Sequence, residues 1–312
     1  MFENILQAIK EYDTVIIHRH NRPDGDALGS QIGMKHILLE NFPEKTVYAV
    51  GDDPRFFAFM EDSQMDEIPD AAYEGALAII LDTASRHLIS DDRYTKAAGS
   101  VRIDHHIFCE KIADVEVVDT SYESCCGMVT QFALESGLRL SPLAAKSLYT
   151  GMVTDSGRFR YDGTTARTFR LASALLETGF DTNELFRDLY ADDLASKQLK
   201  ARFLLKIQLT EANVAFIYTT LEEFRELGAD TFTVSRGMVN TMADIKGVSI
   251  WVNFTETEQG VLCELRSNRY NINPIAVKYG GGGHQKASGA TVPDRETAMA
   301  MLRDLDALTR TE

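Results

Sequence analysis

The sequence lacks several features that mark particular classes of protein. Its 312 residues include only 7 prolines and no repeated tract, which argues against a disordered or fibrous chain. Its 4 cysteines form no C-x-x-C pair, so neither a disulfide framework nor a zinc ribbon is indicated. No apolar run approaches about 18 residues, and the chain does not open on a basic segment followed by an apolar one. We therefore expect a cytoplasmic protein that has no membrane partner.

Positive charge is also scarce. The chain carries 32 Lys and Arg against 47 Asp and Glu, a formal net charge of −15. Long nucleic acid is held by many Lys and Arg side chains that neutralise phosphates, so the composition argues against a long DNA or RNA partner. A local pocket lined by cations or metal ions remains compatible with this balance.

The adjacent residues Cys125 and Cys126 leave open a strained disulfide or a metal ligand. We interpret them instead as two reduced thiols packed within a helix, because a cytoplasmic protein of this size needs no disulfide to stabilise its core.

At about 150 residues per domain, the length predicts two domains. In the first half, short β-branched runs alternate with amphipathic segments, which is typical of βαβ units and a mostly parallel sheet with flanking helices. The alternation of β-branched runs and amphipathic segments ends after Gly179, where we expect a helix over Leu185–Leu209 and then a smaller α/β domain. The predicted division is residues 1–190, a linker helix at 191–209, and residues 210–312. The expected strands are Thr14–His18, Thr46–Val50, Leu77–Leu81, Val101–Ile103, Val115–Val118, Val214–Tyr218, Val248–Phe254 and Val261–Arg266.

Acidic and imidazole side chains follow three of the expected strands. They are His20, Asp24 and Asp26 after the first strand, Asp82 after Leu77–Leu81, and Asp104-His105-His106 after Val101–Ile103. In an open parallel sheet, ligands bind in the crevice outside the carboxyl ends of the strands. A single aspartate after a strand is commonplace as a turn residue or a helix cap. Acidic and imidazole residues after three strands, including two adjacent histidines, favour a binding site instead.

The residue types in this group indicate the metal and the reaction. Carboxylates and imidazoles without thiolates favour Mn²⁺ or Mg²⁺ over a structural Zn²⁺. The ligands are too many for one ion. Two ions about 3.5–4 Å apart, sharing a carboxylate, would lower the pKa of a bridging water and hold a phosphoryl group for in-line displacement. The sequence therefore predicts phosphoester hydrolysis.

A series of motifs, in this order, resembles those of the DHH phosphoesterase superfamily and its associated C-terminal domain. The motifs are His20-Asn21-Arg22-Pro23-Asp24-Gly25-Asp26-Ala27-Leu28-Gly29-Ser30, Asp82, Asp104-His105-His106, Asp155-Ser156-Gly157-Arg158-Phe159, Arg266-Ser267 and Gly280-Gly281-Gly282-Gly283-His284. The resemblance runs from Tyr12 to Gly289. Within the superfamily the sequence is most similar to the bacterial oligoribonuclease and pAp phosphatase group.

The resemblance implies two bound Mn²⁺ ions, with Mg²⁺ or Co²⁺ as substitutes, and a hydroxide between them as the nucleophile. The implied ligands are His20, Asp24 and Asp82 for one ion, and Asp26, Asp82, His105 and Asp155 for the other. Asp82 would bridge the ions, His106 would face the scissile phosphate, and Asp104 would orient a ligand imidazole. These three are the expected catalytic residues. By itself, the pattern at Asp155 predicts only the end of a helix, and the resemblance replaces that interpretation.

The glycine run points to a second part of the site. A helix cap explains one or two glycines, whereas backbone that must approach a phosphate closely explains all of them and the histidine that follows. The expected substrate contacts are Arg158, Arg266, Ser267, Gly281, Gly282, Gly283 and His284. An ordinary surface charge is an equally good interpretation of Arg158.

The expected function is Mn²⁺-dependent hydrolysis of short oligoribonucleotides such as pApA to nucleoside 5′-monophosphates, with pAp phosphatase activity beside it. Short substrates agree with the acidic composition, and they would enter between the two domains. The alternatives are a cyclic di-AMP phosphodiesterase with the same metal ligands, a longer-strand exonuclease, and a nucleotide-binding protein without catalysis. The choice among these substrates, the cleavage polarity and the existence of a homodimer stay open.

Overall fold

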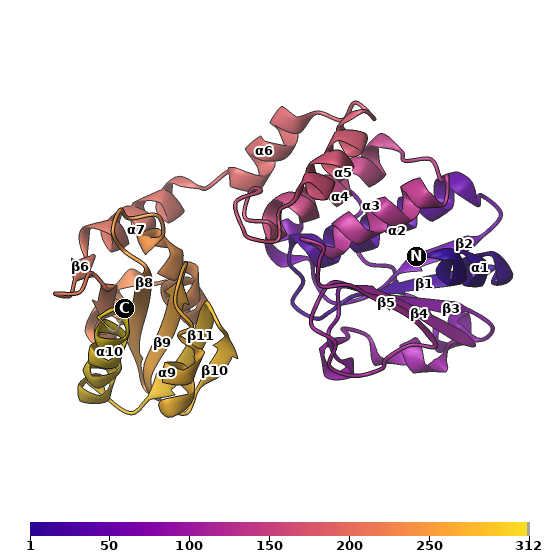
Figure 1. The fold of residues 1–312 in the computed structure, drawn as a ribbon. Coiled ribbons are helices and arrows are strands. Elements are labelled where there is room, and N and C mark those ends of the chain that lie inside the picture. Colours follow the sequence, from indigo (N-terminus) through magenta and orange to yellow (C-terminus); the bar gives the residue numbers. More distant parts are fainter. Residues whose placement is uncertain (311–312) are drawn as a thin grey trace. The chain divides into compact units, whose positions relative to one another are not determined.

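A computed structural model describes residues 1–310, which form two compact units. The first unit is Met1–Ala191, and the second begins at Asp192 (Figure 1). None of the helices in the described range combines the length and the apolar character that crossing a membrane requires.

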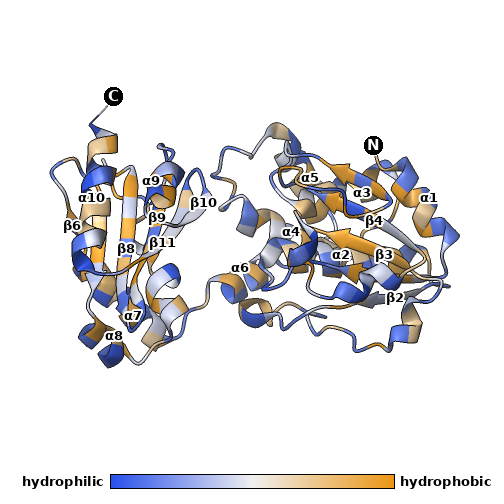
Figure 2. Ribbon diagram, turned by 90° about the horizontal axis from the view of Figure 1, so that it is seen from below, coloured by the Kyte–Doolittle hydropathy of each residue, from blue (hydrophilic) through white to orange (hydrophobic). Residues whose placement is uncertain are grey.

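The first unit is built on a five-stranded sheet in the order β2-β1-β3-β4-β5, with every pair parallel. The strands are rich in Val, Ile and Leu because both faces are covered, and those near β3 and β4 are among the most hydrophobic segments in Figure 2. From β1 the chain adds β2 on one side of the sheet and then β3 to β5 on the other, so the strand order reverses between β1 and β3. At such a reversal a crevice opens beyond the carboxyl ends of the two strands. The strands are β1 Thr14–His18, β2 Thr46–Ala49, β3 Leu77–Leu81, β4 Gly99–Asp104 and β5 Val115–Val118.

Long helices cover only one face of this sheet (Figure 1). Their apolar side chains share a core with Ile17, Ile79 and Ile103. The opposite face, which carries Ile16 and Ile80, is covered by short helical turns in the connections between strands. The helices are α1 Glu3–Glu11, α2 Gly25–Asn41, α3 Cys125–Glu135, α4 Pro142–Asp155, α5 Ala166–Leu176 and α6 Thr182–Tyr190.

Helices α2 and α4 approach each other closely because glycines line their contact. Gly25, Gly29 and Gly33 recur every fourth residue and so share one face of α2. A Cβ atom at Gly29 would lie 2.5 Å from the carbonyl oxygen of Ser147, in α4. This close packing brings the end of α4 beside the beginning of α2.

The second unit contains a mixed six-stranded sheet in the order β10-β11-β9-β8-β7-β6. Helices α9 Asn273–Lys278 and α10 Arg295–Thr309 cover one face, and α7 Leu194–Leu205, α8 Leu221–Leu227 and a π-helical turn lie on the other. The strands are β6 Gln208–Leu209, β7 Ala215–Thr219, β8 Ile250–Thr257, β9 Gly260–Ser267, β10 Gly282–His284 and β11 Ala287–Val292.

The α/β class, the parallel first sheet and the separate α/β unit after it are confirmed, but the predicted continuous helix over Leu185–Leu209 is wrong. The chain forms α6, leaves the helical conformation, and begins α7 at a new cap, where the Asp193 side chain accepts a hydrogen bond from the amide of Ser196. Helix α7 packs into the second unit through Phe203. The extent of a linker at 191–209 stays a prediction.

Candidate metal centre

The carboxyl ends of β1, β3 and β4 bring the predicted acids and imidazoles together. Every predicted metal ligand, together with His106, belongs to one connected cluster, because the groups share Asp82 and His105. Within each group the ligand atoms lie within 4.8 Å of one another. The three groups are Asp82, His105 and His106; His20, Asp24 and Asp82; and Asp26, His105 and Asp155.

Asp82 lies at the centre of the cluster. Its Oδ2 is 3.4 Å from Nε2 of His20, and its Oδ1 is 3.5 Å from Nε2 of His105. The residue has a φ of 49°, a left-handed conformation that is uncommon outside glycine and often found at functional sites. Its Oδ1 is buried and accepts no hydrogen bond from the described residues. A cation would satisfy such an oxygen, so the site fits a divalent ion.

Asp26 and Asp155 reach the cluster from helices. Both oxygens of Asp26 accept hydrogen bonds from the start of α3, Oδ2 from the amide of Cys125 at 2.7 Å and Oδ1 from that of Cys126 at 2.8 Å. The first amides of a helix have no partner within it and favour an anion. At the end of α4, Oδ2 of Asp155 lies 3.5 Å from Nε2 of His105. Helix packing therefore sets the distance between these two carboxylates.

The charges in the cluster are balanced poorly without a cation. Burial raises the pKa of Asp26 well above its ordinary value, and the charges of Asp82 and Asp24 add to the rise. Burial, followed by the charge of Asp26, raises the pKa of Asp155 to about 8. For His20, burial acts to lower the pKa, but Asp24 and Asp82 outweigh it and raise the value to about 11. Carboxylates that repel one another in this way are stabilised by a divalent ion.

Asp104 contacts a different imidazole from the one that the resemblance implies. Its Oδ1 lies 2.8 Å from Nδ1 of His106 rather than beside the predicted ligands His20 or His105. Its Oδ2 accepts a hydrogen bond from Nη2 of Arg102 at 2.5 Å. Asp104 therefore orients the histidine that is predicted to face the phosphate.

Gly151 of α4 faces Asp26 at a distance that leaves no room for a side chain. A Cβ atom there would lie 2.2 Å from Sγ of Cys126 and 3.0 Å from Oδ1 of Asp26. We predict that Gly151→Ala lowers the melting temperature and weakens Mn²⁺ binding, because relieving the overlap costs about 1–3 kcal/mol and displaces Asp26. Thermal unfolding and titration calorimetry measure the two effects.

The double variant Gly151→Ala/Cys126→Ala is the control, since it removes the sulfur that the new methyl group would strike. It is expected to recover part of the lost Mn²⁺ affinity. If Gly151→Ala alone binds Mn²⁺ as tightly as the unchanged protein, Asp26 is not a ligand in this position.

The predicted substrate contact of the first unit, Arg158, lies in an unusual turn. Gly157, Arg158 and Phe159 all have left-handed φ values of 57°, 64° and 61°. The Arg158 side chain is exposed, and its guanidinium lies 5.7 Å from the ring centroid of Tyr190. A turn that holds two consecutive non-glycine residues in this conformation stores strain, which is typical of functional sites. Its role in binding stays a prediction.

In the second unit, the sheet register brings Arg266, Gly282 and His284 to one face. Arg266 pairs with Ala287, which in turn pairs with His284, so the two side chains flank Ala287. Ser267 points to the opposite face. Its buried hydroxyl donates to the carbonyl of Ser249, so the structure does not bring it to His284.

The glycine run is explained partly by packing against β11. A Cβ atom at Gly281 would lie 2.1 Å from the carbonyl oxygen of Gly289, and one at Gly283 would lie 2.6 Å from that of Ala287. At Gly282 a Cβ atom would meet open space. Gly282 is therefore the member of the run for which packing gives no reason, and it lies on the same face as His284.

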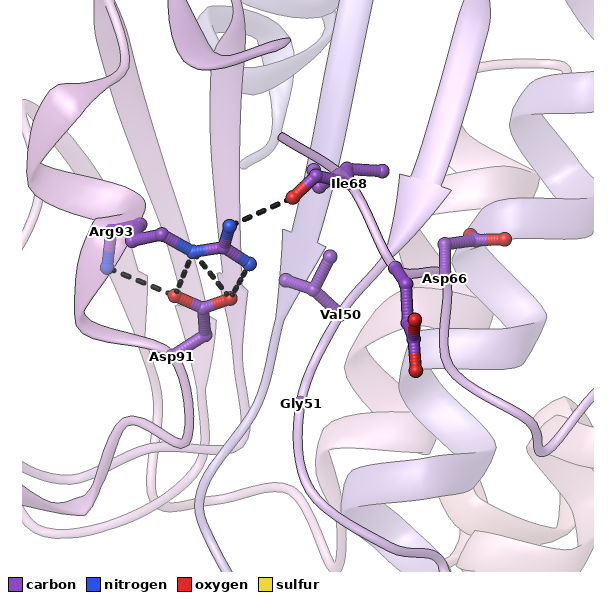
Figure 3. A pocket seen from close by; sticks show the side chains of 7 residues that line it. Val50, Gly51, Asp66, Ile68, Asp91 and Arg93 are labelled. Carbon is purple, nitrogen blue, oxygen red and sulfur yellow. Dashed lines mark hydrogen bonds and ion pairs between the residues drawn. The ribbon is translucent and has the colours of Figure 1, made fainter. Parts of the chain in front are cut away.

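A cavity of about 370 Å³ opens elsewhere in the first unit, beyond the end of β2. Three of its four charged side chains, Asp66, Asp91 and Arg93, are paired within the protein. Figure 3 shows Arg93 turned toward Asp91 and the carbonyl of Ile68, and Asp66 binds Lys35 at 2.8 Å. The lining residues are Val50, Gly51, Asp66, Glu67, Ile68, Asp91 and Arg93. None of these is a predicted ligand, so the candidate site is the cluster and not this cavity.

Sequence reasoning missed two supports of the cluster, Arg102 and the amides of Cys125 and Cys126. The signal for Arg102 is its spacing from Asp104, since residues i and i+2 of a strand share a face. The signal for the amides is Ser124, whose hydroxyl caps α3 by accepting from the amide of Gly127 and so marks a helix N-terminus.

Comparison with known proteins follows the division into two units. Residues 14–152 match the model of the DHH family, N-terminal domain, and residues 213–311 match that of the DHHA1 domain. The chain is 37% identical to a bifunctional oligoribonuclease and PAP phosphatase of Bacillus subtilis, over 99% of this chain and 98% of the relative. It is 27% identical to a cyclic-di-AMP phosphodiesterase of Geobacillus thermodenitrificans, over 93% of this chain and 46% of the relative. The crystal structure of an exopolyphosphatase-related protein from Bacteroides fragilis aligns with a TM-score of 0.88 and 25% identity, over 99% of this chain and 97% of that one.

Proposed function

Because this chain belongs to the DHH family, we propose that it hydrolyses phosphoester bonds in short nucleotides. Its substrates are short oligoribonucleotides such as pApA, which it cleaves to nucleoside 5′-monophosphates, and pAp, from which it removes the 3′-phosphate. The observation that carries the proposal is the cluster around Asp82, whose two oxygens face different histidines. The near full-length similarity to an oligoribonuclease and PAP phosphatase supports the choice of substrate.

The carboxylates and imidazoles of the cluster hold two Mn²⁺ ions, for which Mg²⁺ or Co²⁺ substitutes. When bound, the ions supply a nucleophile from water at neutral pH and neutralise charge on the phosphoryl group. Asp82 contributes to both sites. The other ligands are His20 and Asp24 on one side and Asp26, His105 and Asp155 on the other.

His106 acts on the phosphate. Because Asp104 accepts a hydrogen bond from its Nδ1–H, the ring presents Nε2 to the substrate, and in the doubly protonated ring this nitrogen donates a hydrogen bond to a phosphoryl oxygen. Asp104 fixes the orientation of this ring. In the second unit, the face of Arg266, Gly282 and His284 binds the substrate, with further contacts from Gly281 and Gly283. Arg158 is the proposed substrate contact of the first unit.

Replacing His284 tests the role of the second unit. We expect His284→Ala to raise KM on the order of 10-fold with little change in kcat, because the side chain binds substrate away from the reacting atoms. The control His284→Gln keeps a hydrogen-bond donor and is expected to show a smaller rise. Steady-state kinetics on pApA measure both, and an unchanged KM in His284→Ala would refute this role.

A substrate panel tests the proposed function directly. The protein is incubated with Mn²⁺ and, separately, pApA, pAp, cyclic di-AMP and a five-residue RNA, and the products are separated by chromatography. We expect AMP from pApA and from pAp. Preferential cleavage of cyclic di-AMP would favour the alternative to which the Geobacillus relative points. Binding of these nucleotides without any product would indicate a binding protein and contradict the proposal.

A further inference from the structure

Arg102, in β4, is one of two arginines in the described chain whose side chains are fully buried; the other is Arg19. Moving a guanidinium out of water is unfavourable unless its charge and its hydrogen-bond donors find partners. The partners that Arg102 has found therefore indicate what it does.

The guanidinium of Arg102 joins β4 to both loops that carry candidate catalytic residues. Its Nη2 donates to Oδ2 of Asp104 at 2.5 Å and to the carbonyl of Ala84 at 3.2 Å. Its Nη1 donates to the carbonyl of Glu110 at 3.1 Å and lies 3.5 Å from Oε1 of Glu116. Ala84 follows Asp82 in the loop after β3, and Glu110 follows the histidine pair in the loop after β4. One planar group thus fixes three segments around the site.

Asp104 transmits this constraint to His106. The carboxylate is completely buried, and it binds Arg102 through Oδ2 and Nδ1 of His106 through Oδ1. The two bonds leave the carboxylate no freedom to rotate. A carboxylate held in this way accepts a hydrogen bond from Nδ1–H of the neighbouring imidazole and directs Nε2 away from Asp104.

We propose that Arg102 is a positioning residue for the hydrolysis, acting through Asp104 on the orientation of His106. The inference rests on the proposed function of the cluster and adds a residue to it. Because Arg102 donates its hydrogen bonds to Asp104, Ala84 and Glu110 and to none of the candidate metal ligands, its loss lowers kcat and leaves Mn²⁺ affinity and KM within about twofold of their original values.

The first test compares Arg102→Met with Arg102→Lys in the full chain. We expect kcat on pApA to fall on the order of 10²-fold in Arg102→Met, since small misplacements of a catalytic group have effects of this size. Lysine keeps the charge but lacks the planar fork that binds Asp104, Ala84 and Glu110 together, so Arg102→Lys recovers only part of the loss. It also serves as the test variant if Arg102→Met does not fold. A loss that appears in KM or Mn²⁺ affinity instead of kcat would overturn the proposal.

A double-mutant cycle with His106→Ala separates positioning from a general structural role. If Arg102 acts through His106, Arg102→Met causes no further loss of kcat when His106 is already replaced. Arg19→Met is the matched control, because Arg19 is equally buried but binds Asp52 at 2.6 Å and the carbonyl of His20. Its effect on kcat is expected to be the same with and without His106. If Arg102→Met lowered kcat by the same factor with and without His106→Ala, the result would contradict the inference.

A measurement without substrate keeps this inference distinct from the proposed function. Imidazole ¹⁵N spectra of the full chain with Mg²⁺ report whether the Nδ1–H of His106 is held in a hydrogen bond. We expect one set of His106 signals with a slowly exchanging Nδ1–H in the original protein, and faster exchange of that proton or several sets of signals in the Arg102 variants. If no substrate of the panel is hydrolysed, the proposed function fails while these spectra still decide the role of Arg102. Identical His106 spectra in all variants would refute it.

Discussion

Asp82→Asn is expected to lower kcat on pApA on the order of 10³-fold or more. Asparagine keeps the size of the side chain but removes the charge from the one carboxylate that belongs to two ligand groups. The substitution therefore weakens both candidate ion sites at once, whereas the loss of His20 or Asp155 would weaken one. Single-turnover kinetics and calorimetric Mn²⁺ stoichiometry measure the effect.

Asp13→Asn is the matched control. Asp13 is an exposed carboxylate just before the amino end of β1, at the opposite end of the strand from the cluster. Its replacement is expected to leave kcat and Mn²⁺ stoichiometry unchanged. Asp82→Asn with activity near that of the Asp13 control would show that hydrolysis occurs at another site.

Removing divalent ions with EDTA is expected to abolish hydrolysis and to lower the melting temperature. Without cations the carboxylates of buried Asp26 and half-buried Asp155 repel each other and Asp82. An ion that binds only the folded protein stabilises it by about 2.7 kcal/mol at 100 times its dissociation constant. Adding Mn²⁺ back should restore both properties. Activity assays and differential scanning calorimetry measure both properties after the ions are removed and after Mn²⁺ is added back.

Removing the ions with EDTA and adding Mn²⁺ back to Asp82→Asn provides the comparison. The Mn²⁺-dependent rise in melting temperature is expected to be smaller there, because one shared ligand has lost its charge. Hydrolysis that continues in EDTA, or a melting temperature that does not respond to Mn²⁺, would contradict a metal centre at this cluster.

The parts of the site that follow strands could be predicted from the sequence. Leu77–Leu81 is an uninterrupted apolar run, and such a run in a parallel sheet is buried on both faces, so the polar residue after it must lie at the sheet edge. The same reasoning places His20 after β1 and Asp104 at the end of β4. The family resemblance is confirmed by the domain matches, and it was needed for Asp155, which lies at the end of a helix.

Contacts between elements that are distant in the chain could not be predicted. The amides that hold Asp26 come from α3, about a hundred residues later, and only packing against α2 and α4 brings them together. The hairpin of β10 and β11 also escaped prediction, because a glycine run has no side-chain alternation. The cap at Asp193 interrupts a pattern of apolar residues that otherwise looks helical, and local hydrogen bonding decided that break.

The most direct test of the two-ion centre is a crystal structure of the protein grown with Mn²⁺, with data collected at the manganese absorption edge. We expect two anomalous peaks about 3.5–4 Å apart, each bonded to a different oxygen of Asp82. Asp26 and Asp155 should contact the same peak. Absence of manganese beside Asp82, or Asp26 and Asp155 turned away from each other, would contradict the account.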